Sequence, residues 1–284
     1  MGLIGNAEKA QCARVVAAAA RQIVAAGRQV LADAATARLA RLPVHPCPDA
    51  ATLAQQVQLI LVFGGDGTML QVAREIAGLR TPMLGVNIGG LGFLTAVPSR
   101  RLTPALRLIW DGRFTFERRT LLDARARDGG RTTRFRALND VVVSHGWESR
   151  MIELELLVNH VPVTCYRGDG LIVSSPTGST AYSLAAGGAV VVPTAAVFEV
   201  TPICPHTLSN RSLILDQRST ISVRVLTSKP AAVLSADGQA VAELASGAEI
   251  TIRRSADCVH LMHLAGSSFF EALREKLHWR GTTL

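Results

Sequence analysis

An unbroken apolar run, LILVF at residues 59–63, leads directly into the glycine turn GGDGT. Apolar runs of this kind are typical of strands that are covered on both faces, as in a parallel sheet. A helix is predicted at about residues 69–78, and a second apolar run, PMLGVNIG, follows it at residues 82–89. A buried strand, a helix and another buried strand in this order predict a doubly wound α/β domain with a Rossmann-like parallel sheet.

The same alternation begins at the N-terminus. Strands are predicted at residues 1–5 and 28–32, and helices at residues 7–26 and 33–39. The sequence therefore predicts that an α/β domain occupies residues 1–115.

The hydrophobic period changes at about residue 115. Apolar residues then alternate with polar ones in five segments, at residues 114–127, 132–145, 151–160, 218–226 and 248–255. A period of two predicts strands, so a mainly antiparallel, β-rich domain is expected over residues 116–260. Residues 268–279 have a helical pattern and close the chain.

The composition indicates a compact protein, because 48% of the residues are hydrophobic and 18% are charged. The net charge of +8 means that an anionic partner has to be considered. The densest basic cluster, at residues 124–136, alternates around Asp128-Gly129-Gly130 like an exposed β-hairpin, without the aromatic interleaving of a nucleic-acid site. No nucleic acid is therefore expected as a partner, and the sequence leaves open whether residues 118–136 also steer phosphates.

Two further features bear on location. The five cysteines are odd in number and form no CxxC pair, which favours a reducing compartment and a cytoplasmic protein. The segment 170–198 contains no charged residue, but Pro176, Pro193 and the pair Gly187-Gly188 would interrupt a spanning helix. No membrane association is expected.

The GGDGT turn differs from the two common phosphate loops. It lacks the lysine of G-x-x-x-x-G-K-[ST], and no G-x-G-x-x-G is completed. Its position between a strand and a helix nevertheless suits anion binding by backbone N–H groups, and its glycines allow close approach of a phosphate chain. A carboxylate at Asp66 could hold Mg²⁺, take a proton from an attacking hydroxyl, or serve only as a helix cap.

Polar groups are also dense at YRGDGLIVSSPTGSTAY, residues 166–182. The hydroxyls of Thr177, Ser179 and Thr180 either cap a helix predicted at residues 181–186 or bind a polar ligand. Upstream, ALNDVVV places an amide and an acid in a predicted strand; these groups suit an adenine edge and paired ribose hydroxyls, or end a strand at a turn.

Together these motifs resemble the NAD kinase family, which phosphorylates the 2′-hydroxyl of the adenosine ribose of NAD to give NADP. The resemblance runs in order from about residue 59 to residue 279. It rests on GGDGT, NIGGLGFLT, LNDVVV, YRGDGLIVSSPTGSTAYSLAAGG, TPICPHTLSNRSL, ADGQ and LREKLHW.

The resemblance implies roles for individual residues. Asp66 is implied as the general base and Asp169 as the acid near the nicotinamide, and Asn139 with Asp140 is implied to bind the adenosine. The implied phosphate loop comprises Gly64, Gly65, Gly67 and Thr68. The full set of implied NAD contacts is Asp66, Gly67, Asn139, Asp140, Arg150, Arg167, Asp169, Thr180, Ala181, Tyr182, Ser183, Ala185 and Gln239.

The family also implies ATP as phosphoryl donor, Mg²⁺ or another divalent cation as cofactor, and a homo-oligomer that is a dimer or a tetramer. It implies that residues 261–284 return to the first domain. Two residues depart from the pattern: Ala185 replaces a serine and Ala189 a proline. The alternatives are a lipid kinase with the same turn, a non-catalytic dinucleotide sensor and an NADP phosphatase.

Overall fold

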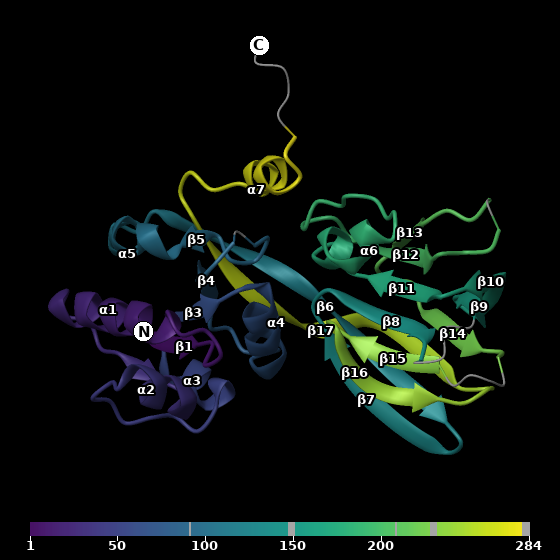
Figure 1. Cartoon of the computed structure of the whole chain (residues 1–284), viewed down its shortest axis with the longest axis horizontal. Helices are drawn as coiled ribbons and strands as arrows, with labels where there is room; N and C mark the ends of the chain where they lie inside the picture. The colour runs from purple at the N-terminus through teal and green to yellow at the C-terminus, as the bar shows by residue number, and fades with distance from the viewer. Residues whose placement is uncertain (91, 147–150, 208, 228–231, 280–284) are drawn as a thin grey trace, which may run out of the picture. The chain divides into compact units, whose positions relative to one another are not determined.

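The computed structural model describes residues 1–90, 92–146, 151–207, 209–227 and 232–279. The chain forms two compact units, one of Met1–Arg118 with Cys258–Leu284 and one of Arg119–Asp257 (Figure 1). Two long strands, β6 (Phe114–Asp128) and β17 (Glu249–Leu264), carry the chain from one unit to the other. Within these described ranges no helix is long and apolar enough to cross a membrane.

The first unit contains a parallel sheet in the order β2-β1-β3-β4. Its strands are β1 (Gly2–Gly5), β2 (Leu31–Ala32), β3 (Ile60–Gly64), β4 (Met83–Asn87) and the short β5 (Val97–Pro98), which pairs with β4. The chain adds β2 on one side of β1 and then returns to add β3 on the other. This reversal creates a topological switch point between β1 and β3, which is where open α/β sheets bind ligands.

Helices cover this sheet. They are α1 (Cys12–Ala25), α2 (Ala34–Ala40), α3 (Ala50–Gln56), α4 (Asp66–Glu75) and α5 (Leu102–Trp110), with a 3₁₀ turn at Ser99–Arg101. The last helix of this unit, α7 (Phe269–Lys276), follows β17. Leu61 and Phe63 pack in one buried cluster with residues of α1 and α5. Gly2 lies against Leu53 of α3, on the face opposite to its neighbour Leu3. The predicted α/β class is confirmed.

Two helices in this unit differ from the prediction. The helix expected at residues 69–78 begins at Asp66, because Gly65 has extended backbone angles and serves as its N-cap. Helix α3 was not predicted; Asp49 caps it by accepting a hydrogen bond from the backbone N–H of Thr52 at 2.7 Å.

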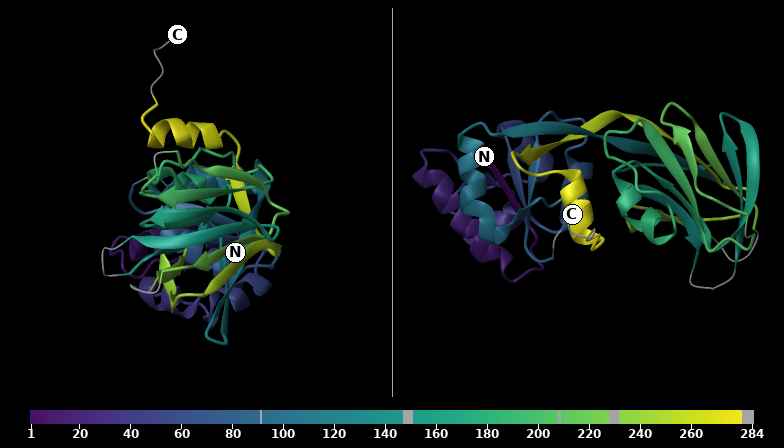
Figure 2. Two further views of the ribbon diagram at one scale, coloured as in Figure 1. Left: turned by 90° about the vertical axis from the view of Figure 1, so that its right-hand side faces the viewer. Right: turned by 90° about the horizontal axis from the view of Figure 1, so that it is seen from above.

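The second unit consists of two sheets that lie face to face around one apolar core (Figure 2). The six-stranded antiparallel sheet has the order β13-β12-β11-β8-β15-β16. Its strands are β8 (Asp140–His145), β11 (Gly170–Ser174), β12 (Val197–Ile203), β13 (Leu213–Asp216), β15 (Ala232–Ala236) and β16 (Gln239–Leu244).

The facing sheet is also antiparallel within this unit, in the order β10-β9-β14-β17. It contains β9 (Ile152–Val158), β10 (Val161–Gly168) and β14 (Ile221–Val225), and β17 also pairs with β6 of the β6–β7 hairpin. The hairpin turns at Gly129 and Gly130, whose φ angles of 50° and 85° require glycine-like freedom, and this confirms the predicted turn.

One predicted strand is wrong. Residues 132–145 form two strands, β7 (Arg131–Ala137) and β8, which belong to different sheets. Leu138 and Asn139 lie between them, and their backbone N–H groups bond to the carboxylate of Asp237 instead of to a neighbouring strand. The alternation of apolar and polar residues is interrupted at this junction by Ala137-Leu138 and Asn139-Asp140. This agrees with the alternative that the Asn-Asp pair marks the end of a strand at a turn.

Candidate active site

The GGDGT turn joins β3 to α4 at the carboxyl end of the parallel sheet. Gly64 has no room for a side chain, because a Cβ there would meet the side chain of Thr68. The Thr68 hydroxyl accepts a hydrogen bond from Asn6 Nδ2 at 3.1 Å, which ties the turn to the end of β1. Gly67 is exposed, with nothing within 4 Å of its Cβ position. The turn is therefore rigid at its base and open at its tip.

The carboxylate of Asp66 is held by three donors from one distant loop. Its Oδ2 accepts from the backbone N–H of Phe93 at 2.8 Å. Its Oδ1 accepts from the backbone N–H of Leu94 at 3.1 Å and from the hydroxyl of Thr95 at 3.2 Å. A carboxylate offers about four lone-pair positions, so one remains for a ligand. The carboxylate is oriented by this loop and does not act only as a cap on its own helix.

Asn87, at the end of β4, supports the same loop. Its Nδ2 donates to the carbonyl of Gly90 at 2.6 Å and to the hydroxyl of Thr95 at 2.7 Å. Its side chain is 3% exposed, and its Oδ1 has no hydrogen-bond partner. The predicted site residues do not include Asn87, Phe93, Leu94 or Thr95; the signal for these residues was the NIGGLGFLT motif itself.

In the second unit, Asn139 precedes β8 and Asp140 begins it. The carboxylate of Asp237 accepts from the backbone N–H groups of Leu138 at 3.1 Å and Asn139 at 2.7 Å. Asp237 and Gly238 both have positive φ angles, 47° and 75°, in the two-residue turn between β15 and β16. Asp237 is therefore a positioning residue for the Asn-Asp pair, and only the ADGQ motif hinted at it.

Asp140 is nearly enclosed, at 4% exposure. Burial, and secondarily the negative charge of Asp237, raise the pKa of Asp140 to about 7. The Oδ1 of the neighbouring Asn139 is buried and has no hydrogen-bond partner. Two adjacent polar groups are thus held away from water, and a ligand with hydroxyl and amino donors would satisfy them.

The PTGST turn packs directly on this pair. A Cβ at Gly178 would overlap the backbone of Asn139, and Ser175 N–H donates to the Asn139 carbonyl at 2.8 Å. The hydroxyls of the turn bond mainly to backbone: Ser179 to Pro176 O at 2.9 Å, and Thr180 to Thr177 O at 3.3 Å. These hydroxyl groups therefore stabilise the turn itself. A 3₁₀ turn at Gly178–Thr180 leads into a helix of four residues, α6 (Tyr182–Ala185), which is shorter than predicted.

Ser183 is fully buried in α6. Its hydroxyl donates to Glu199 Oε2 at 2.9 Å and lies 2.8 Å from the hydroxyl of Thr201. Glu199 is itself 1% exposed and also accepts from the N–H of Ala189 at 2.5 Å. In contrast, Tyr182 and Ala185 are exposed on the same helix. Within the predicted contact segment at residues 180–185, the side chain of Ser183 is therefore buried, whereas those of Tyr182 and Ala185 are accessible to a ligand.

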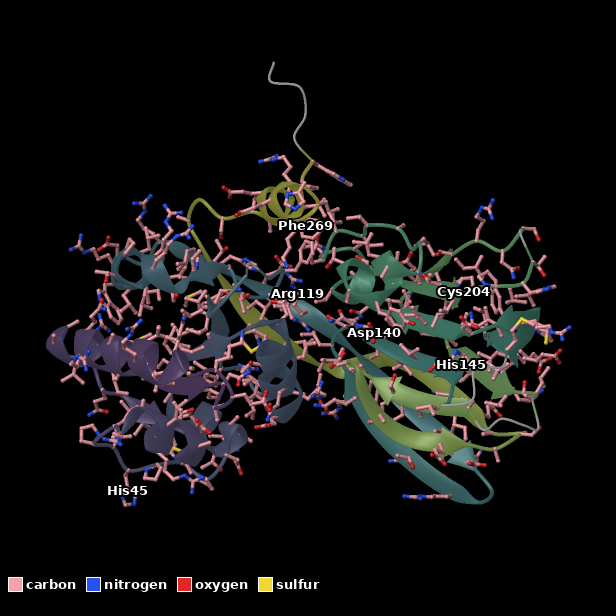
Figure 3. All side chains as sticks on the ribbon, in the orientation of Figure 1. His45, Arg119, Asp140, His145, Cys204 and Phe269 are labelled. Atoms are coloured by element: carbon pink, nitrogen blue, oxygen red, sulfur yellow. The ribbon has the colours of Figure 1, made fainter. Side chains whose placement is uncertain are left out.

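Asp169 lies at the other end of β8 from Asp140. Its backbone carbonyl accepts from His145 N–H at 2.9 Å, and its carboxylate lies 4.0 Å from His145 Nε2. Figure 3 labels Asp140 and His145, which lie at the two ends of β8. The Asp169 carboxylate also bonds to the thiol of Cys204 and raises the pKa of that thiol. Gly168 is needed here because a Cβ would meet the carbonyl of Ile203 at 2.8 Å.

Three remaining predicted contacts are more dispersed. Arg167, on β10, lies 3.8 Å from Glu153, and both side chains are largely exposed. Gln239 is exposed at the beginning of β16. Arg150 lies outside the described residues.

A protein-only metal cage does not exist in the parts of the chain described, since no three His, Cys, Asp or Glu side chains gather there. This does not conflict with Mg²⁺, which is commonly held by one or two carboxylates together with substrate phosphates. The lone-pair position left on Asp66 fits that mode. A bound divalent ion would supply shielding of phosphate charge.

A parallel α/β unit with a carboxylate in its glycine turn, together with a two-sheet β unit, suits a two-domain enzyme that transfers phosphoryl groups. Residues 1–114 match the ATP-NAD kinase N-terminal domain, and residues 138–264 match the ATP-NAD kinase C-terminal domain. The chain is 44% identical over 241 residues to the NAD kinase of Heliobacterium modesticaldum, covering 84% of this chain and 85% of that protein. The chain therefore belongs to the NAD kinase family, and its activity is ATP-dependent phosphorylation of NAD to NADP.

Solved structures show the same fold. Yeast NADH kinase in complex with NADH matches with a TM-score of 0.88 and 22% identity, covering 100% of this chain and 88% of that one. An NAD kinase from Archaeoglobus fulgidus in complex with ATP matches with a TM-score of 0.76 and 23% identity, covering 99% of each chain.

Proposed function

We propose that Asp66 is the general base of this NAD kinase, which removes the proton of the adenosine 2′-hydroxyl as that oxygen attacks the γ-phosphorus of ATP. The proposal rests on the three hydrogen bonds that the Asp66 carboxylate accepts from Phe93, Leu94 and Thr95. A general base must be held in a productive orientation while keeping a free lone pair, and this arrangement provides both. The new bond joins the 2′-oxygen to the γ-phosphorus, the bond to the β–γ bridging oxygen breaks, and ADP leaves.

The phosphate loop of Gly64, Gly65, Gly67 and Thr68 is proposed to receive phosphate groups. It spans the start of α4, with Gly67 and Thr68 in the first turn of the helix, where free N–H groups and the positive dipole end favour an anion. Because Gly67 has open space around its Cβ position, a phosphate chain could approach the backbone closely.

The NAD contacts proposed in the second unit lie at the two ends of β8. Asn139 and Asp140 at its beginning would bind the adenosine, and Asp169 beside its end would bind near the nicotinamide. Six residues of extended strand span about 17 Å, a separation that suits the two ends of a dinucleotide better than a single nucleoside. Ribose hydroxyls would give the buried Asp140 the donors that it needs.

The remaining NAD contacts, Arg167, Thr180, Ala181, Tyr182, Ser183, Ala185 and Gln239, are proposed on the family resemblance, as is Arg150. A divalent cation, a homo-oligomer and a cytoplasmic location also stay predictions. Family membership favours NAD over a lipid substrate.

The decisive experiment measures NADP formation from NAD, ATP and Mg²⁺ by the purified protein and by Asp66→Asn. The amide keeps the size of the side chain but cannot take the proton, so kcat should fall by about 10²–10⁴. NAD binding, measured by calorimetry, should change little. If Asp66→Asn retained more than a tenth of the wild-type kcat, the general-base role would be excluded. A wild-type protein that bound NAD without turnover would instead indicate a sensor.

A further inference from the structure

The loop between β1 and α1 carries a lysine to the phosphate edge of the parallel sheet. Lys9 Nζ donates to the backbone carbonyl of Ile88 at 3.2 Å, across 79 positions of sequence. The same atom lies 3.6 Å from the Cβ position of Gly65 and 3.4 Å from that of Gly89. The ammonium group therefore faces the turns that follow β3 and β4, at the carboxyl ends of adjacent strands.

This position coincides with the topological switch point. Because β3 was added on the side of β1 opposite to β2, the loops after β1 and β3 diverge and leave an opening at the sheet edge. Lys9 belongs to the loop after β1, and Gly65 to the loop after β3. A cation at this opening faces the part of an α/β sheet where ligands bind.

Lys9 has unused binding capacity. It is half-buried, and no carboxylate of the described ranges forms an ion pair with it. An ammonium group has three donors, and the Ile88 carbonyl accounts for one. If the side chain of Lys9 only held the loop in place, a neutral hydrogen-bond donor would bond to the Ile88 carbonyl equally well, and a positive charge would not be needed. An anion between the two glycine turns would use the remaining donors.

A second and independent observation marks the same opening. Asn87 Oδ1 is buried, has no hydrogen-bond partner, and lies 3.9 Å from the Cβ position of Gly89 that Lys9 also approaches. Buried acceptors are rarely left without a donor, so an orphan of this kind points to a ligand. The hydroxyls or ordered waters that accompany a nucleotide phosphate would provide that donor.

We propose that Lys9 binds the triphosphate of the phosphoryl donor through its non-bridging oxygens. This inference rests on the proposed function. GGDGT lacks the lysine that phosphate loops of the G-x-x-x-x-G-K-[ST] type carry within the motif. Here the cation comes instead from a separate loop, after β1. Together with the N-terminal end of α4, Lys9 would neutralise the negative charge of the triphosphate while the γ-phosphoryl group is transferred.

The test compares Lys9→Gln and Lys9→Arg with Arg14→Gln. Arg14 is an exposed residue of α1, so its replacement controls for the loss of one positive charge from the same segment. Steady-state rates are measured with ATP varied at saturating NAD, and with NAD varied at saturating ATP. For Lys9→Gln the KM for ATP should rise 10- to 100-fold, while the KM for NAD stays within twofold. Lys9→Arg, which keeps the charge, should recover part of the loss, and Arg14→Gln should behave as wild type.

Binding of ATP to the same variants, measured by calorimetry without NAD, provides a readout that does not need turnover. Lys9→Gln should bind ATP at least tenfold more weakly than wild type, with the same thermal midpoint of unfolding. If ATP affinity and the KM for ATP were both unchanged, the inference would be overturned while the proposed reaction stood. A rise confined to the KM for NAD would assign the ammonium to the acceptor diphosphate and overturn the donor assignment. If the wild type made no NADP, ATP binding would still decide the role of Lys9.

Discussion

Gly92 lies so close to Asp66 that a Cβ at position 92 would overlap the Asp66 carboxylate and crowd the hydroxyl of Thr95. The glycine therefore holds the space in which the proposed base is oriented. The requirement for glycine at this position is steric.

This contact predicts that Gly92→Ala lowers kcat. The added methyl group must displace the carboxylate or the loop, and misplacement of a catalytic group by about 1 Å can cost about 10²-fold in rate. Gly90→Ala is a matched control in the same loop, because nothing lies within 4 Å of its Cβ position. Equal kcat values for the two variants would contradict this account of Gly92.

Asp140→Asn should stabilise the protein in a pH-dependent way. Burial, and then Asp237, raise the pKa of Asp140 to about 7, whereas an unfolded Asp has a pKa of about 3.9. Between these values the folded state holds a proton that the unfolded state has released, so the free energy of unfolding falls as pH rises from about 4 to about 7. Above pH 7 the cost reaches at most about 4 kcal/mol, and the amide removes it.

Urea unfolding of wild type and Asp140→Asn at pH 5 and pH 8 checks this sign. The gain in unfolding free energy should be larger at pH 8. Asp216→Asn is the control. Asp216 is solvent-exposed, and its hydrogen bonds with Arg218 lower its pKa to about 2, so no gain in unfolding free energy is expected. If Asp140 binds ribose hydroxyls, the stabilised variant should also bind NAD about 10- to 100-fold more weakly.

Asp237→Ala should loosen the Asn-Asp pair. The change removes the acceptor for the N–H groups of Leu138 and Asn139, which then lose their partner in a partly buried site. The free energy of unfolding should fall by about 1–3 kcal/mol and the KM for NAD should rise, with kcat less affected. Asp128→Ala removes a comparable carboxylate that accepts from Ala245 N–H at an exposed hairpin. A KM for NAD that rises equally in both variants would refute the positioning role.

Ser183→Ala should act on stability more than on binding. Glu199 is buried and would lose one of its hydrogen-bond donors, which should cost about 1–3 kcal/mol of unfolding free energy. Any contact of Ser183 with NAD would then come from its backbone, and the KM for NAD should stay within twofold. The double variant with Glu199→Gln should recover part of the stability, because the neutral amide costs less to bury. A tenfold rise in KM at unchanged stability would show that the hydroxyl contacts the ligand.

The sequence by itself determined the local units. The apolar run LILVF, the glycine turn after it and the apolar run after that are neighbours in sequence, and they predicted the parallel α/β unit correctly. The turn at Gly129-Gly130 was predictable for the same reason, since turn chemistry depends on a few adjacent residues. The motifs together also identified the family.

Only the tertiary structure decided how the polar side chains are used. The donors to Asp66 lie 27 to 29 positions away, Asp237 bonds to residues 98 and 99 positions away, and Lys9 reaches a carbonyl 79 positions away. Periodicity and turn propensity carry no information on contacts between residues so far apart in the sequence. These contacts are set by the order in which strands join a sheet. The sequence therefore determined which elements form, and strand order decided which loops share an edge and which polar groups meet there.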